Sequence, residues 1–234
     1  MKKMNWFWGT NRPSRSNRGW LCYVLAWFGL MSALGGCAAN EEAIKKSQGY
    51  YQEGLANLEG DRQKSFVSFQ KSVQLNPNNK EARYALGHVY ALQGKFPQAE
   101  EEFREAIKID DTYSEAYTYR GRILANQGRW EEAIKCYRKA LSNPLYATPD
   151  LARYHLGRAL AHQGDLQASM EMLEDAVMVS PPSVPPALTH LELGRVYYQL
   201  GYTTKAREVL QKVKSLDKDG EYGAAATELL ARLK

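Results

Sequence analysis

The sequence predicts an all-α fold built of stacked helical hairpins, and three observations lead to this fold class. A glycine recurs inside apolar-periodic segments at Gly87, Gly121, Gly157 and Gly194, at intervals of 34, 36 and 37 residues. A second glycine follows seven residues after each of these four, and a large apolar or aromatic residue recurs in the segment beyond it. A repeat of this length, with the periodicity of helices and a turn in its middle, is typical of helical-hairpin solenoids.

The two glycines indicate two structural roles. A glycine within a helix costs about 1 kcal/mol relative to alanine, so its recurrence at the first position implies a packing requirement. We expect small residues of the second helix to face this glycine, at Ser65, Ser72, Ala99, Ala106, Ala133, Ala140, Ser169, Ala176 and Ala206. The second glycine is expected to end the first helix in the left-handed conformation, at Gly60, Gly94, Gly128, Gly164 and Gly201. Large residues at Phe69, Phe103, Tyr137, Leu173 and Leu210 are expected to bury a stripe against the next hairpin.

This pattern resembles the tetratricopeptide repeat over about Lys46 to Lys218, and the resemblance implies a right-handed superhelix of about five hairpins. The implied solenoid covers residues 46–234, with repeats at about 46–79, 80–113, 114–149, 150–186 and 187–218. A last helix at about 221–234 is expected to cap the open end of the stack. The first copy is one residue short before Gly60.

The N-terminal region predicts export and lipidation. Residues 1–19 carry five basic residues and no acid, and the apolar run Trp20 to Leu34 is shorter than the roughly 20 residues that span a membrane. Residues 1–36 are therefore interpreted as a signal peptide. The sequence Leu34-Gly35-Gly36-Cys37 resembles the bacterial lipobox, which implies lipidation of Cys37 and a short tether over 37–45. An anchor helix with an incidental cysteine is the alternative.

The residue after the cysteine and the charge balance indicate where such a protein works. Ala38 stands where an aspartate favours retention in the inner membrane, so resemblance to the sorting pattern implies the periplasmic face of the outer membrane. Five of the 31 basic residues and none of the 26 acidic residues precede Cys37, which leaves 26 of each. This balance gives no basic excess for nucleic acid, and we expect no nucleic-acid partner.

The chemistry-bearing residues give no sign of catalysis. The four histidines, His88, His155, His162 and His190, have no metal-site spacing, and no phosphate loop or nucleophile motif occurs. Cys136 is the cysteine that remains after Cys22 and Cys37, and it is expected to be a small, partly buried helix residue. We therefore expect no enzyme activity, no cofactor, no metal and no small-molecule substrate.

A partner-binding groove follows from the tetratricopeptide register, in which first helices form the concave wall. The resemblance assigns to this groove Tyr51, Tyr84, His88, Arg122, Asn126, Tyr154, Arg158, His162, Arg195 and Tyr198, while Leu55, Thr118 and Leu191 share the same register positions. Arginines flanked by tyrosines can bond carboxylates and carbonyls and can stack on apolar side chains. The alternative is that Arg122, Arg158 and Arg195 pair with acids on neighbouring helices.

One inter-repeat segment carries a narrower resemblance. Residues 143–149 read Asn-Pro-Leu-Tyr-Ala-Thr-Pro, which is similar to a loop of the type IV pilus biogenesis and stability lipoproteins. That family implies a pilotin, an outer-membrane lipoprotein that binds the pilus secretin and promotes its membrane localisation and multimer assembly. The chain departs from the family at Ala125 and Ala159, where cysteines are frequent, and in having fewer than six repeats. A general lipid-anchored envelope scaffold for cell-wall enzymes or another outer-membrane assembly is the alternative function.

Overall fold

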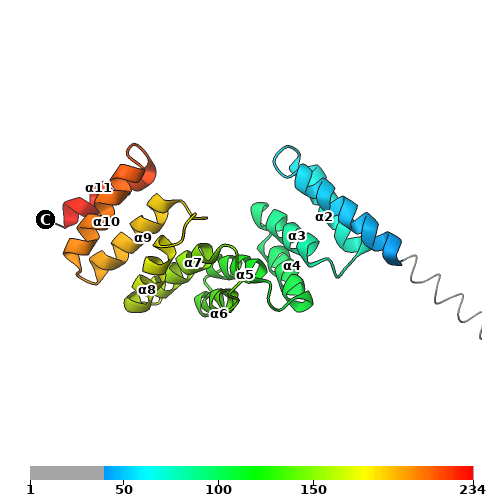
Figure 1. Cartoon of the computed structure of the whole chain (residues 1–234), viewed down its shortest axis with the longest axis horizontal. Coiled ribbons are helices and arrows are strands. Elements are labelled where there is room, and N and C mark those ends of the chain that lie inside the picture. The colour runs from blue at the N-terminus through cyan, green and yellow to red at the C-terminus, as the bar shows by residue number, and fades with distance from the viewer. Residues whose placement is uncertain (1–39, 234) are drawn as a thin grey trace, which may run out of the picture. The chain divides into compact units, whose positions relative to one another are not determined.

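The computed structural model describes residues 40–233, and this part of the chain is helical and contains no strand (Figure 1). The helices are residues 40–56, α2 (Arg62–Leu75), α3 (Lys80–Leu92), α4 (Phe96–Ile109), α5 (Ser114–Asn126), α6 (Trp130–Leu141), α7 (Pro149–His162), α8 (Leu166–Val177), α9 (Pro186–Gln199), α10 (Thr203–Leu216) and α11 (Glu221–Arg232). The predicted all-α fold class is confirmed.

The start of the first helix differs from the predicted tether over 37–45. Residues 40–45 are helical, because Glu41 and Glu42 favour a helix N-terminus and Glu42 forms an ion pair with Lys46 one turn later, at 2.8 Å. Of the described residues, 40–46 belong to one unit, and residues 47–233 lie in a second unit that holds all the contacts described below.

Consecutive helices pack in pairs, and each pair packs on the next. Within pairs the contacts join α3 to α4, α5 to α6, α7 to α8, and α9 to α10. Between pairs, α2 contacts α3, α4 contacts α5, α6 contacts α7, and α8 contacts α9. The first helices also touch in sequence, α3 with α5, α5 with α7, and α7 with α9. Side chains on one face of these first helices are therefore brought together.

The turn within each hairpin is the glycine turn that the sequence predicts, with one exception. Four of the five glycines have positive φ, at Gly94, Gly128, Gly164 and Gly201. After α3, the N–H of Lys95 bonds to the carbonyl of Tyr90 at 2.9 Å, which satisfies a carbonyl that the helix end leaves free. The prediction for Gly60 is wrong, because the first copy is one residue short. There the helix ends at residue 56, a turn covers 57–60, and Asp61 caps α2 by accepting from the Lys64 N–H at 2.9 Å.

The early glycines make room for the large residue of their own hairpin. A methyl group on Gly121 would lie 2.5 Å from the ring of Tyr137, and one on Gly87 would lie 2.9 Å from the ring of Phe103. The expectation that small residues face this glycine therefore needs correction, since a large side chain fills the space. Two of the predicted small residues do contact it through polar atoms: Ser65 donates to the Gly54 carbonyl at 2.8 Å and Ser169 donates to the Gly157 carbonyl at 2.7 Å.

The last helix completes the core of the final hairpin. Asp217 accepts bonds from the N–H groups of Tyr222 and Gly223 and so starts α11, which packs on α9 and α10. Ala226 is fully buried and Leu233 is 7% exposed, both within the apolar cluster that contains Leu210 and Val213. This agrees with the expected capping helix.

The repeat intervals of 36 and 37 residues are longer than the first interval of 34, so the junctions between α6 and α7 and between α8 and α9 are called stretched junctions. The first of them, between α6 and α7, folds back onto α5. Asn143 donates to the Thr112 carbonyl at 3.0 Å and accepts from the Leu145 N–H at 3.0 Å, which fixes the turn. Tyr146 is buried and its hydroxyl lies 2.9 Å from that of Thr118. Leu145, in contrast, is 88% exposed. The segment that carries the pilus-family resemblance is therefore a packed structural element with one large exposed apolar side chain, Leu145.

The second stretched junction, between α8 and α9, is held by one buried carboxylate. Asp150 in the first turn of α7 is 2% exposed and accepts from the Ser183 N–H and hydroxyl, both at 2.6 Å, and from the Val184 N–H at 3.1 Å. Val184 is in turn buried in the cluster that contains Tyr154. These bonds fix where the fifth hairpin begins relative to the fourth.

Within residues 40–233, no helix combines the length and the apolar character needed to cross a bilayer. The predicted signal peptide (1–36) and the predicted lipidation site, Cys37, lie outside the described residues.

Candidate functional site

The first helices of the second, third and fourth hairpins bring six side chains together. They are Tyr84 and His88 on α3, Tyr119 and Arg122 on α5, and His155 and Arg158 on α7. We call this set the arginine–aromatic surface. Four of the six were predicted from the sequence, and Tyr119 and His155 were not. Both lie three residues before a predicted arginine, a spacing that places two residues on one helix face.

Tyr119 is the centre of the surface. Its ring centroid lies 5.5 Å from that of Tyr84 and 5.2 Å from that of His88, both edge to face, and the Arg122 guanidinium lies 4.7 Å above it. Burial raises the pKa of Tyr84 and lowers the pKa of His88, and the Arg122 charge lowers the His88 pKa further. At neutral pH these rings are uncharged, so they form an aromatic platform beside a cation.

The two central arginines stack on tyrosines and do not pair with acids. Arg122 lies over Tyr119, and the Arg158 guanidinium lies 5.6 Å from the Tyr154 ring centroid. Among the described residues, neither has a carboxylate within ion-pair distance. Arg83, by comparison, binds Glu102 at 2.9 Å, and Arg120 binds Glu100 at 3.3 Å. The alternative that all the register arginines pair with neighbouring acids is therefore wrong for Arg122 and Arg158.

His155 lies within the electrostatic reach of both arginines. Burial, together with the positive charges of Arg122 and Arg158, lowers its pKa to about 3. Its ring stacks on Tyr137 at 5.8 Å with 16° between the planes. A protonated imidazole here would add a third positive charge near Arg122 and Arg158, so the ring stays neutral at neutral pH.

A small cleft opens beside this surface, between α3 and α5. Its volume is about 100 Å³, and it is lined by His88, Ala91, Leu92, Phe96, Tyr119, Arg122, Ile123 and Asn126. Leu92 at its edge is 57% exposed. The cleft is thus lined by apolar side chains together with Arg122 and the predicted groove residue Asn126. An apolar side chain with a neighbouring backbone carbonyl or carboxylate suits this combination.

The other predicted groove residues lie apart from this surface or beneath it. Tyr51 packs on Phe69 at 6.0 Å, His162 stacks on Trp130 at 4.0 Å, and Arg195 pairs with Glu192 at 2.6 Å. Tyr198 is 37% exposed on α9. Three positions of the predicted wall are buried in the core: Tyr154 is 4% exposed, Leu191 is 2% exposed, and Thr118 is fully covered. Tyr146 and Val184, which come from the two stretched junctions, pack in these regions.

The remaining reactive groups fit structural roles. Cys136 is 6% exposed, as expected, and burial raises its thiol pKa, which disfavours the nucleophilic thiolate. In residues 40–233, no three His, Cys, Asp or Glu side chains gather as metal ligands would. What the described surface offers is recognition through stacking, charge and shape.

Comparison with protein families gives three matches, each described as tetratricopeptide repeat. They cover residues 56–123, 118–185 and 187–219. The comparison with curated protein sequences gives no match.

Solved structures with the same fold include two pilus proteins. One is PilW, described as a widely conserved type IV pilus biogenesis factor, with 24% identity, a TM-score of 0.66, and coverage of 73% of this chain and 77% of that one. Another is PilF of Pseudomonas aeruginosa, with 21% identity, a TM-score of 0.66, and coverage of 83% and 93%.

A third is YrrB, a tetratricopeptide-repeat protein with an unusual peptide-binding site, with 18% identity, a TM-score of 0.60, and coverage of 76% and 90%. At these identities the likeness concerns the fold. The glycine turns, the paired helices and the three family matches together place this chain in the tetratricopeptide-repeat family, whose members are typically protein-interaction scaffolds.

Proposed function

We propose that this chain is a pilotin: a lipoprotein, anchored through Cys37 at the periplasmic face of the outer membrane, that binds the type IV pilus secretin and promotes its localisation and multimer assembly. The observation that carries the binding role is the pair of arginines, Arg122 and Arg158, that no described carboxylate neutralises. Support for the pilus role comes from the likeness to PilW and PilF and from the loop at 143–149.

In this proposal a secretin segment lies along the arginine–aromatic surface. An apolar side chain of the segment enters the cleft beside Tyr119, and carbonyl or carboxylate oxygens of the segment bond to the guanidiniums. Hydrogen bonds to charged groups contribute about 1.5–3 kcal/mol each, so two arginines can account for much of the affinity of a short segment. The lipid anchor raises the effective concentration of both proteins at the membrane, and no catalytic step is needed.

Arg122→Ala and Arg158→Ala together test the binding role. The double variant is expected to capture secretin at least about tenfold more weakly than the unchanged chain, which corresponds to about 1.4 kcal/mol. Arg104→Ala with Arg232→Ala is the matched control, because both arginines are exposed and pair with acids elsewhere in the chain. Undiminished capture by a folded double variant would remove this surface from the proposal.

Deletion of the gene tests the pilus role, with an immunoblot for secretin multimers and an assay of twitching motility. We expect loss of multimers and of motility. Normal multimers would favour the general envelope scaffold. Cys37→Ser tests the anchor: the substituted chain should leave the membrane fraction, and its retention there would contradict lipidation at Cys37.

A further inference from the structure

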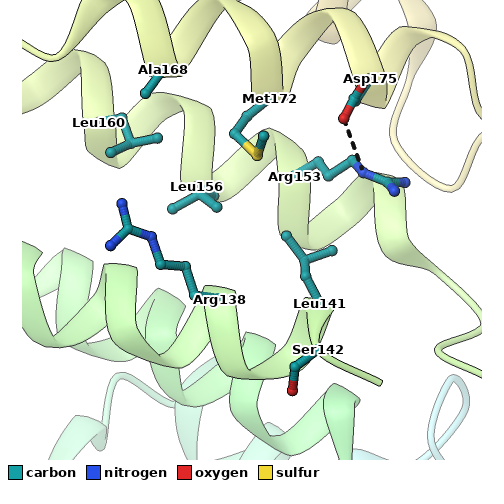
Figure 2. Close-up of a pocket in the computed structure, with 9 residues that line it drawn as sticks. All are labelled: Arg138, Leu141, Ser142, Arg153, Leu156, Leu160, Ala168, Met172 and Asp175. Carbon is teal, nitrogen blue, oxygen red and sulfur yellow. Dashed lines mark ion pairs between the residues drawn. The ribbon is translucent and has the colours of Figure 1, made fainter. Parts of the chain in front are cut away.

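A second cavity lies in the same unit, among α6, α7 and α8, and shares no residue with the arginine–aromatic surface. Its volume is about 390 Å³. Figure 2 shows its nine lining residues, Arg138, Leu141, Ser142, Arg153, Leu156, Leu160, Ala168, Met172 and Asp175. Leu156 and Leu160 come from α7 between the two flanking helices, and Arg138 extends from α6 alongside them. Cavities of this size are in the range of ligand-binding pockets.

The cavity exists because this junction has shorter side chains than its neighbours. Leu156 precedes the early glycine of its repeat, and the same position in the preceding repeat is Arg120, which reaches across to Glu100. Leu160 lies three residues after that glycine, where two other repeats have Tyr90 and Tyr197. The Tyr197 hydroxyl bonds to Glu174 and so bridges its own junction. Leucines at both positions, with Ala168 opposite, leave the space open.

The α6 side of the cavity carries one positive charge in its lining, that of Arg138. Arg138 lies on α6 together with Lys135 and Lys139, and among the described residues none of the three has a carboxylate within ion-pair distance, although Lys135 lies in the field of Glu132. On α4, the equivalent helix of the preceding hairpin, Arg104 and Lys108 each pair with a glutamate three residues earlier. α6 has no acid after Glu132. The lining thus holds two arginines, Arg138 and Arg153, and one carboxylate, Asp175, which contacts Arg153 at 3.9 Å. The positive charge of Arg138 is left over, which favours an acidic occupant.

Exposed apolar side chains follow the two helices that flank the cavity. Leu145, just after α6, is 88% exposed on a turn that Asn143 holds in place, and Met178, just after α8, is 81% exposed. Leu145 lies three residues after the lining residue Ser142, and Met178 lies three residues after the lining residue Asp175. Exposed large apolar side chains of this kind are typical of surfaces that bind other proteins.

We propose that this cavity is a second docking site, and that its occupant is an amphipathic helix of a partner protein. The helix would place one or two large apolar side chains on Leu156, Leu160 and Met172, and its carboxylates would face Arg138 and the lysines of α6. The site extends the proposed function: one surface would hold the secretin segment, and this cavity would hold a different, acidic segment.

The test uses the full chain and a fluorescein-labelled, alanine-based helical peptide with two leucines one turn apart and glutamates beside them. Fluorescence anisotropy should show saturable binding, weaker by at least about tenfold for the same peptide with lysine in place of glutamate. Arg138→Glu should reverse this preference. Leu160→Tyr, which places in the cavity the residue that two other repeats carry, should reduce binding of the acidic peptide by about tenfold or more.

Three controls separate this site from the others. Arg104→Glu, at the equivalent position of α4, and the Arg122→Ala, Arg158→Ala pair should leave peptide binding unchanged. Circular dichroism melting checks that Leu160→Tyr folds. The proposal is overturned if both peptides bind equally, or if Arg138→Glu and a folded Leu160→Tyr bind as the unchanged chain does. It is likewise overturned if Leu160→Tyr instead abolishes a self-association seen by sedimentation, since the occupant would then be a second copy.

Discussion

Removing the carboxylate of Asp150 should loosen the fifth hairpin from the fourth. The side chain is 2% exposed and accepts three hydrogen bonds from Ser183 and Val184. In Asp150→Ala the N–H of Val184, a residue 5% exposed, loses its partner, and an unpaired buried donor costs about 1–3 kcal/mol. Ser183 is exposed and can bond to water instead. The hydrogen bonds to the charged carboxylate contribute about 1.5–3 kcal/mol in addition, so the free energy of unfolding should fall by about 3 kcal/mol.

Urea unfolding followed by circular dichroism measures this loss, and thermal unfolding should shift by about 6–12 °C for a chain of this size. Because the stability of a repeat array is a sum of repeat and interface terms, the loss should fall on the interface between the fourth and fifth hairpins. Asp150→Asn keeps one acceptor and should lose about half as much. Asp175→Ala, which removes an exposed carboxylate with a 3.9 Å contact to Arg153, is the control. An Asp150→Ala variant that loses no more than this control would refute the reasoning.

Three further perturbations test the packing and the electrostatics. Folding lowers the pKa of His155 from 6.5 to about 3, so the folded state binds this proton less readily than the unfolded state does. The free energy of unfolding should therefore fall by about 2 kcal/mol between about pH 7.5 and about pH 5. Urea unfolding at both pH values should show a smaller fall for His155→Phe. Gly121→Ala should destabilise the chain by about 1–3 kcal/mol in urea unfolding, because the new methyl lies 2.5 Å from the Tyr137 ring. Glu100→Ala should cost about 1–3 kcal/mol by the same measurement, since Arg120 loses its carboxylate partner and Arg129 loses one of its two.

Each of these predictions has a matched comparison. Equal pH slopes in the unchanged chain and His155→Phe would contradict the assignment of a neutral histidine. Gly49→Ala has no atom within 4 Å of the new methyl and should stabilise the chain by about 0.5–1 kcal/mol. A loss of stability in Gly49→Ala would show that replacing a glycine destabilises this chain for a reason other than steric overlap. Glu101→Ala removes an exposed pair and should change stability by less than about 0.5 kcal/mol, and a similar loss in both glutamate variants would argue against a special role for Glu100.

The sequence alone was enough to predict the helix pairs, because the recurring glycines and large residues report contacts made within each hairpin. Four side chains of the arginine–aromatic surface were predicted from the register that the family resemblance supplies, in which the first helices form the concave wall. The sequence did not predict that Thr118 is covered, since that depends on Tyr146, which comes from a junction with no counterpart in the other repeats. It also assigned Gly60 a left-handed conformation, which this glycine does not adopt in the shorter first copy.

The missed residues have a common cause. Tyr119 and His155 share a helix face with Arg122 and Arg158, so their spacing was visible in the sequence. Their roles were not, because the neutral state of His155 depends on burial and on two charges from different hairpins. The cavity among α6, α7 and α8 is a similar case. It arises because Leu156 and Leu160 are shorter than Arg120 and Tyr197, the residues at the same positions of other repeats. The empty space that this leaves is evident only when the neighbouring helices are in place.

Two guanidiniums without counter-charges also act beyond their contact distance. Their field extends to about 10 Å at an ionic strength of about 0.1 M, so an oppositely charged segment is attracted before it touches Arg122 or Arg158. Diffusional encounter with such a segment should therefore quicken as salt is lowered.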